Sequence, residues 1–184
     1  MSGKFKSVSE SETTITELMI PSYANFGGKV HGGILLSLMD KVAYVCASKH
    51  AGAYCVTVAV DGVEFLSPVE VGELVSLKAS VNYVGNTSMI VGIRVEALQP
   101  KTGSVKHTNS CYFTMAAKDD DGKLLTVPGL ILENEEQLRR FCEGKHLKGL
   151  SKQKRELLKS DLSSTSSNEM LTLIEQERCI VVID

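Results

Sequence analysis

The sequence predicts an α+β fold in which a curved antiparallel sheet wraps around one long helix. The residues from Ile34 to Ala47 are nearly all apolar, within a helix predicted to run to about His50, and a helix that is apolar over most of its circumference is expected to be buried. After it, segments recur in which apolar and polar residues alternate, which is the period of half-buried strands. Because one helix is available to cover this sheet, we expect the sheet to curve around it.

The predicted helix follows a glycine-rich loop. Pro21 and Gly27–Gly28 exclude regular structure before it, and Gly32–Gly33 allow a tight turn and the close approach of another backbone or a ligand. Ala51–Gly52 is predicted to end the helix. A first strand is predicted before the loop, from Ile15 to Ile20.

Residue types and alternation predict the later strands. We expect the first of them to bend at Gly62, and the short turn Gly85–Asn86 to join two alternating segments into a hairpin. In the last of them, His107 and Asn109 are expected on the same face as Cys111. The predicted strands are Tyr54–Leu66, Val75–Tyr83, Met89–Ala97 and Val105–Ala117.

The segment after residue 130 differs in composition. Asn134–Gln137 has the form of a capping box, and a charged helix is predicted to about Lys159. Its excess of positive charge is suited to phosphate, and a solvated surface helix is the alternative. Ser160–Asn168 is predicted to be a flexible linker. We therefore expect a folded domain over residues 1–130 and a charged helical extension over 131–184.

Composition excludes several classes of protein. The 184 residues carry a formal net charge of −2, which argues against nucleic acid as the main partner. The five cysteines are widely spaced and form no Cys-x-x-Cys, so we expect reduced thiols and neither a metal site nor a disulfide framework. Apolar runs are too short for a membrane span, and the polar segment Met1–Glu12 predicts no secretory signal.

Asp40 stands in the middle of the apolar helix. Asp is a poor mid-helix residue, and a buried carboxylate is costly. One interpretation places Asp40 on a polar stripe with Ser37 and Tyr44, facing water. The other uses Gly33, which lies nearly on the same helical face about two turns earlier. A carboxylate beside the free N–H groups of a helix N-terminus is suited to attack on a carbonyl and to oxyanion binding.

The pattern Asn-x-x-Gly-x-Val-His-Gly-Gly-x-Leu-Leu-x-x-Met-Asp, from Asn25 to Asp40, resembles the signature of hotdog-fold acyl-CoA thioesterases that hydrolyse cytosolic acyl-CoAs. The likeness continues through Val56–Asp61 and Phe65–Val75 and ends near Pro128. It implies a hotdog domain within residues 1–130, hydrolysis of acyl-CoA to free acid and CoA, and a cytoplasmic location. CoA is implied as part of the substrate, with no further cofactor.

By this resemblance, Asp40 is the catalytic acid residue, which either attacks the thioester or deprotonates water. Asn25 is implied to reach the site from the opposite subunit, while the residues alone also allow a turn or cap role. Gly33 is expected to supply an oxyanion N–H, Thr57 a hydroxyl that faces the site, and His31 a structural or substrate-lining group. The expected substrate-binding positions are Gly32, Val84, Gly85, Asn86, Thr87 and Ser88.

A curved sheet of this kind leaves edge strands that need pairing or protection. The resemblance implies a homodimer with two composite sites at its interface, often assembled as a trimer of dimers. Two other functions remain as alternatives: a non-catalytic acyl-CoA-binding sensor, and a hotdog hydratase or dehydratase, for which no His/Asp or His/Glu motif is visible. Release of free thiol from acyl-CoA separates a hydrolase from a sensor.

Overall fold

The computed structural model describes residues 5–164, 166–174 and 178–182. Its contacts divide the chain into two compact units, Met1–Leu147 and Lys148–Asp184. This division falls later than the predicted boundary after residue 130, because the beginning of α2 packs against the sheet. Among the described helices, none combines the length and the apolar character needed to cross a bilayer.

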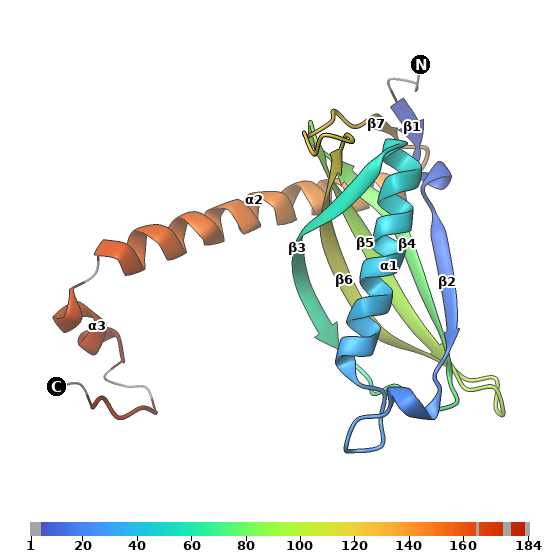
Figure 1. Ribbon diagram of the computed structural model, residues 1–184, viewed down its shortest axis with the longest axis horizontal. Coiled ribbons are helices and arrows are strands. Elements are labelled where there is room, and N and C mark those ends of the chain that lie inside the picture. The colour runs from blue at the N-terminus through green and yellow to red at the C-terminus, as the bar shows by residue number, and fades with distance from the viewer. Residues whose placement is uncertain (1–4, 165, 175–177, 183–184) are drawn as a thin grey trace. The chain divides into compact units, whose positions relative to one another are not determined.

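Five strands of the first unit form one antiparallel sheet in the order β2-β4-β5-β6-β3 (Figure 1). The predicted strands are confirmed, and the first begins and ends two residues earlier than expected. β3 pairs with β6 and forms one edge of this sheet. The strands are β2 Thr13–Leu18, β3 Tyr54–Phe65, β4 Leu74–Val84, β5 Ser88–Leu98 and β6 Val105–Lys118.

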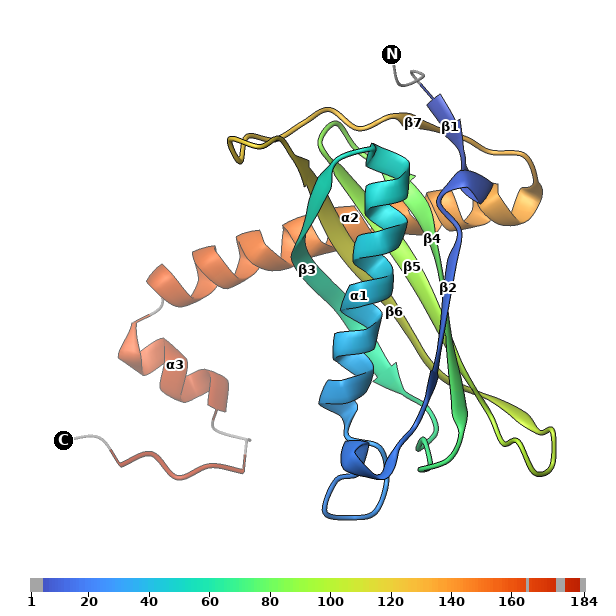
Figure 2. The same cartoon turned by 45° about the vertical axis from the view of Figure 1, so that its right-hand side comes forward.

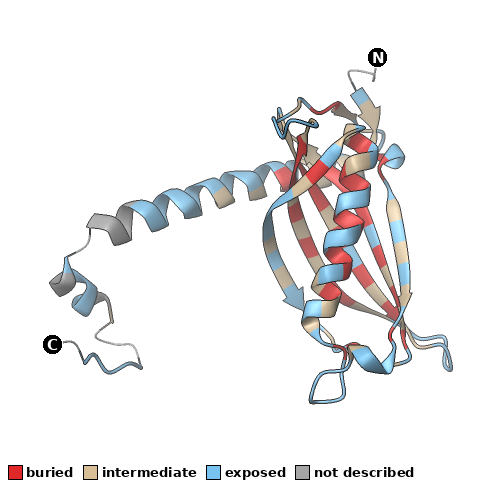
Figure 3. Cartoon of the chain, viewed as in Figure 1, coloured by how far each residue is buried: buried red, intermediate tan, exposed pale blue. Residues whose placement is uncertain are grey.

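The single long helix of this unit, α1 (Gly32–Ala51), lies along one face of the sheet (Figure 2). It ends at Gly52, whose φ of 67° is the left-handed conformation that glycine adopts readily. Its buried side packs into the core through residues such as Met39 and Val42. Its opposite side is exposed, as Figure 3 shows by colour, because the sheet covers only one side of it. The expectation that α1 is buried around most of its circumference is therefore wrong for a single chain.

A bulge in β6 overturns one predicted face. His107 pairs with Glu96 and Asn109 with Val95, so Thr108 is an extra residue between two ladder positions. Since directly paired residues share a side, Asn109 is buried with Val95, whereas His107 lies on the side of Glu96. The prediction that His107 and Asn109 share a face was wrong, because the bulge reverses the alternation.

Two short strands escaped prediction. β1 (Phe5–Ser7) and β7 (Gly129–Ile131) pair in parallel as a separate sheet. Gly129 lies close to the ring of the exposed Phe5, which a Cβ at this position would displace. Short 3₁₀ turns, Val8–Glu10 and Pro21–Tyr23, complete the connections on either side of β2.

Two helices follow, α2 (Glu135–Ser164) and α3 (Ser167–Ile174). The predicted cap is present, since the Gln137 N–H donates to Asn134 Oδ1 over 2.9 Å. The first turns of α2 pack on β4 and β6. The rings of Phe141 and Tyr83 lie 5.0 Å apart with their planes tilted by 50°, and the Tyr112 hydroxyl donates to Glu143 over 2.8 Å. The prediction of a flexible linker over 160–168 was wrong for the residues that belong to α2 and α3. Residue 165 lies outside the described residues.

Candidate active site

Two predicted site residues meet at the border of α1 and β3. The Thr57 hydroxyl donates to Asp40 Oδ1 over 2.6 Å, and it also lies 3.4 Å from Met115 Sδ. Thr57 pairs with Met115 in the sheet, and Met115 is fully buried. The rigid sheet therefore holds the threonine, and the threonine fixes the carboxylate of the helix.

Asp40 is exposed in the single chain, so the interpretation that places its carboxylate inside a buried helix was wrong at this level. Ser37, Lys41 and Tyr44 of the same helix are exposed too, as the interpretation of a polar stripe expects. An apolar surface on α1 and β3 is exposed as well. Its exposed side chains are Tyr44 (41%), Val45 (37%), Tyr54 (58%), Val58 (56%) and Val60 (44%). Apolar surface beside a free strand edge is typical of a protein–protein interface.

The N-terminus of α1 differs from the predicted oxyanion site. His31 is the N-cap residue, and its Nδ1 accepts the N–H of Gly33 over 2.8 Å. Gly33 therefore already has an acceptor, and the structural interpretation of His31 fits its capping contact. Gly32 is a point of close packing, since a Cβ there would stand 3.1 Å from the Phe65 ring. The sequence signal for this cap was a polar side chain directly before the helix.

Asn25 has the turn role that the residues alone allowed. Its Oδ1 accepts the N–H groups of Gly27 over 2.8 Å and Lys29 over 3.2 Å. The loop of residues 24–30 projects beyond the N-terminal end of α1 in Figures 1 and 2, and Asp40 lies about 12 Å further along the helix. One chain therefore does not bring Asn25 to its own Asp40.

The turn from Val84 to Ser88 lies at the other end of α1. Ser88 pairs with Ala116, and the next residue, Ala117, pairs with Cys55. Cys55 follows the end of α1 closely in the chain. The carbonyl of Asn86 accepts the Val127 N–H over 2.9 Å. Within one chain, the substrate-binding positions predicted on this turn are thus far from Gly32 and the N-terminus of α1.

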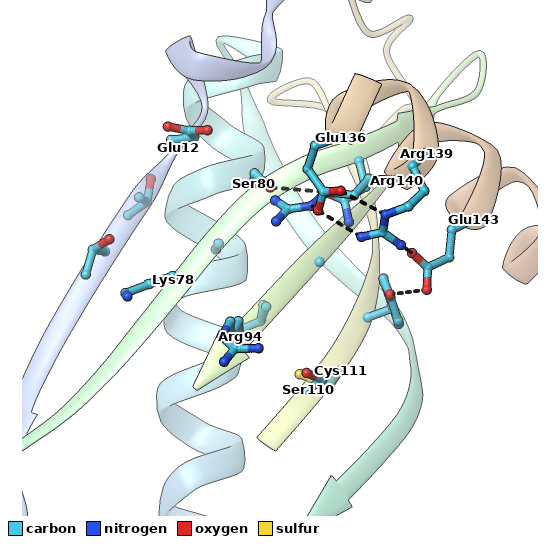
Figure 4. Close-up of a pocket in the computed structure, with 17 residues that line it drawn as sticks. Glu12, Lys78, Ser80, Arg94, Ser110, Cys111, Glu136, Arg139, Arg140 and Glu143 are labelled. Carbon is cyan, nitrogen blue, oxygen red and sulfur yellow. Dashed lines mark hydrogen bonds and ion pairs between the residues drawn. The ribbon is translucent and has the colours of Figure 1, made fainter. Parts of the chain in front are cut away.

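A polar hollow of about 460 Å³ lies between the sheet and the start of α2 (Figure 4). Asp40 is not among its lining residues. The cations that line it are paired with carboxylates: Lys78–Glu96, Arg94–Glu96, Arg139–Glu136, Arg139–Glu143 and Arg140–Glu136. Hydrogen bonds from Lys78 and Arg94 hold the pKa of Glu96 at about 2. The positive patch expected on α2 is therefore largely neutralised at this hollow.

The buried cysteines are poor nucleophiles. Burial raises the pKa of the Cys46 and Cys111 thiols to about 12, which keeps them protonated at neutral pH. Cys142 and Cys179 are exposed. In the part of the chain that the structure describes, no group of three or more His, Cys, Asp or Glu side chains is arranged to hold a metal ion.

Comparison with known proteins identifies the class. Residues 27–104 match the model of the thioesterase superfamily. The protein VdlD of Helicobacter pylori is 48% identical over 124 residues, which are 67% of this chain and 71% of that protein. The chain belongs to the thioesterase superfamily.

More specific relatives are acyl-CoA hydrolases. The cytosolic acyl coenzyme A thioester hydrolase of Rattus norvegicus is 34% identical over 140 residues, 75% of this chain and 37% of that protein. A crystal structure of an apo hexameric acyl-CoA thioesterase matches with a TM-score of 0.81 and 33% identity, covering 83% of this chain and 98% of that one. These similarities confirm the predicted hotdog fold.

The acyl-CoA hydrolase of Staphylococcus aureus, solved with butyryl coenzyme A and coenzyme A, matches with a TM-score of 0.79 and 30% identity, covering 86% of this chain and 97% of that one. Three further structures of that protein carry single replacements by alanine, of a threonine, an aspartate and an asparagine respectively.

Proposed function

We propose that this protein hydrolyses acyl-CoA thioesters to the free acid and CoA, with Asp40 as the catalytic acid residue. The observation that carries the proposal is the Asp40 carboxylate held by Thr57 over 2.6 Å in an apolar surface. The alanine variants of the Staphylococcus aureus hydrolase support it, because their asparagine, aspartate and threonine are spaced 15 and 17 residues apart, as are Asn25, Asp40 and Thr57.

Asp40 acts through the oxygen that Thr57 does not hold. That oxygen either takes a proton from the attacking water or attacks the thioester carbonyl itself. In the first route, water adds to the acyl carbon as the C–S bond breaks. In the second, the C–S bond breaks as an anhydride forms between Asp40 and the acyl group, and water then cleaves this anhydride to the free acid and the original carboxylate. In both, the CoA sulfur leaves as a thiolate that takes up a proton. Gly33 contributes its N–H to the oxyanion only when the His31 ring turns away from it. Beyond the CoA of the substrate, the proposed reaction uses no cofactor.

The site becomes complete in a homodimer formed through the β3 edge, and three such dimers form the hexamer. The free edge and the exposed apolar surface beside Asp40 support the dimer, and the hexameric neighbour supports the larger assembly. Antiparallel pairing of two β3 strands brings the Val84–Ser88 turn of one chain toward the N-terminal end of α1 in the other. Substrate CoA then binds between chains, against this turn and Gly32.

The hotdog domain occupies residues 1–130, and residues 131–184 are an extension of it. The cytosolic rat relative supports a cytoplasmic location. These assignments complete the proposed enzyme.

Release of free thiol from a series of acyl-CoAs tests the function. We expect turnover by the wild-type protein and a loss of at least 100-fold in kcat for Asp40→Asn. Asp120→Asn, the same change at an exposed turn residue, should keep wild-type activity. Because Cys142 and Cys179 are exposed and react with thiol reagents, protein without substrate gives the background. Wild-type protein that releases no thiol, or Asp40→Asn with full activity, would exclude the proposal.

A further inference from the structure

The tip of the loop 24–30 carries an aromatic side chain that packs against nothing in its own chain. Phe26 is exposed to 114% of its reference area, more than any other large apolar residue described. A large aromatic ring in water gains nothing for the fold, because the hydrophobic effect rewards only its burial. A surface outside its own chain is needed to bury it.

The loop is held too firmly to fold back over the ring. The Asn25 N–H donates to the Lys29 carbonyl over 2.7 Å, while Asn25 Oδ1 receives two backbone N–H groups. Lys29 forms an ion pair with Glu70 over 2.6 Å, and the Val30 N–H donates to the carbonyl of Val69, a buried residue. Phe26 is thus presented at a fixed place, next to an Asn25 whose Nδ2 group remains to donate.

A second copy of the chain offers the matching surface. Exposed apolar side chains lie on α1 and β3, the two elements that carry Asp40 and Thr57, and β3 is an edge strand of the sheet. Every copy carries both the protruding ring and this surface. A two-fold dimer can therefore bury both rings in equivalent contacts.

The lengths of α1 and β3 place the two features together. If two β3 strands pair antiparallel with their midpoints opposite each other, Thr57 of the second copy lies about 16 Å along the strand from Thr57 of the first, in the direction of Phe65. Gly32 packs against Phe65, and Asp40 lies about 12 Å from Gly32 along α1. The Asp40–Thr57 pair of the second copy thus arrives beside the N-terminal end of α1, where the loop projects.

We propose that Phe26 anchors the loop of one subunit in the apolar surface beside Asp40 and Thr57 of a second copy, and so positions Asn25 in that copy's active site. The inference rests on the proposed hydrolase and its β3 dimer. Phe26 is a positioning residue and not a catalytic one, because it acts through Asn25. Its apolar contact excludes water from one side of the reacting carboxylate.

Mixed dimers test this directly. Dimers of Asp40→Asn chains and dimers of Asn25→Ala chains are each expected to be inactive. A tagged mixed dimer contains one intact site, to which the Asn25→Ala chain supplies Asp40 and the Asp40→Asn chain supplies Asn25. Phe26→Ala is then added to either chain. On the chain that supplies Asn25 we expect at least a tenfold loss of kcat. On the chain that supplies Asp40 we expect no change, because the loop 24–30 of that chain reaches the other site, in which both Asp40 and Asn25 are replaced.

Every other outcome overturns the inference. Equal effects from the two placements, no effect from either, or full activity of Asn25→Ala would exclude the positioning role. Losses that light scattering attributes to dissociation would mean that Phe26 only holds the subunits together. Failure of the proposed function is distinct, because wild-type protein would then release no thiol. Phe26→Leu on the supplying chain should retain more activity than Phe26→Ala, since an apolar anchor remains.

Discussion

Replacement of Thr57 by valine removes the hydroxyl that fixes Asp40 and little else. Valine has nearly the shape of threonine, and its second methyl group lies against the Met115 sulfur, an apolar neighbour. Because a methyl carbon cannot stand 2.6 Å from Asp40 Oδ1 as the hydroxyl does, the carboxylate also moves away from position 57. Thr57 is exposed in the single chain, so the substitution leaves no buried polar group without a partner. Its effect on activity should therefore report the bond to the carboxylate.

The size of the effect follows from that bond. A hydrogen bond of 2.6 Å to a carboxylate is short and charge-assisted. Such bonds contribute about 1.5–3 kcal/mol. Since about 1.4 kcal/mol corresponds to a tenfold change in rate, we expect kcat/KM to fall about 10- to 150-fold.

Steady-state thiol release with one acyl-CoA measures this change, with thermal unfolding as the test of a retained fold. Thr57→Ser keeps the hydroxyl and should lose much less activity than Thr57→Val. A folded Thr57→Val protein with wild-type kcat/KM would refute the idea that the threonine positions the acid. Equal losses in both variants would instead attribute the effect to the lost methyl group.

Three further predictions concern stability. His31→Ala removes the acceptor of the Gly33 N–H and should lower the free energy of unfolding by about 1 kcal/mol, measured in urea, whereas His31→Asn should keep the cap. Gly144→Ala places a Cβ 2.7 Å from the Tyr83 Cβ and should lower the melting temperature, while Gly149→Ala, with nothing within 4 Å, should not. Burial lowers the pKa of His50, so the free energy of unfolding should be highest above pH 6.5 and should decline below it. His50→Gln should lack this dependence, which a comparison of the urea midpoints at pH 7.5 and pH 5.5 measures.

The sequence was informative wherever a local pattern fixes the backbone. The period of α1, the alternation within the strands and the glycine at position 52 specify conformations that need only near neighbours, and all were predicted. The bulge at Thr108 was not, because one extra residue leaves the composition of β6 unchanged while reversing its faces. β1 and β7 escaped because three residues are too few to show a period.

The candidate site was predictable in its residue types but less so in its geometry. The resemblance implied that the Thr57 hydroxyl faces the site of Asp40, but it did not predict the hydrogen bond between them. The contact of His31 with Gly33 likewise depends on a side-chain rotation that no pattern encodes. The exposure of Asp40 could not be derived from an apolar helix either. Periodicity shows that residues are apolar, but it does not show whether the surface that covers them belongs to the same chain.

That distinction gives the exposed carboxylate a physical meaning. In open water, the attraction between a charged acid and nearby dipoles is weakened by the high dielectric constant, and a hydrated carboxylate is a weak base toward water and a weak nucleophile toward a thioester. Covering the apolar surface around Asp40 with a second chain would remove water without moving the bond to Thr57. Association would then strengthen every polar contact at the site. On this reasoning the dimer contributes to catalysis through the dielectric environment as well as through the residues that it supplies.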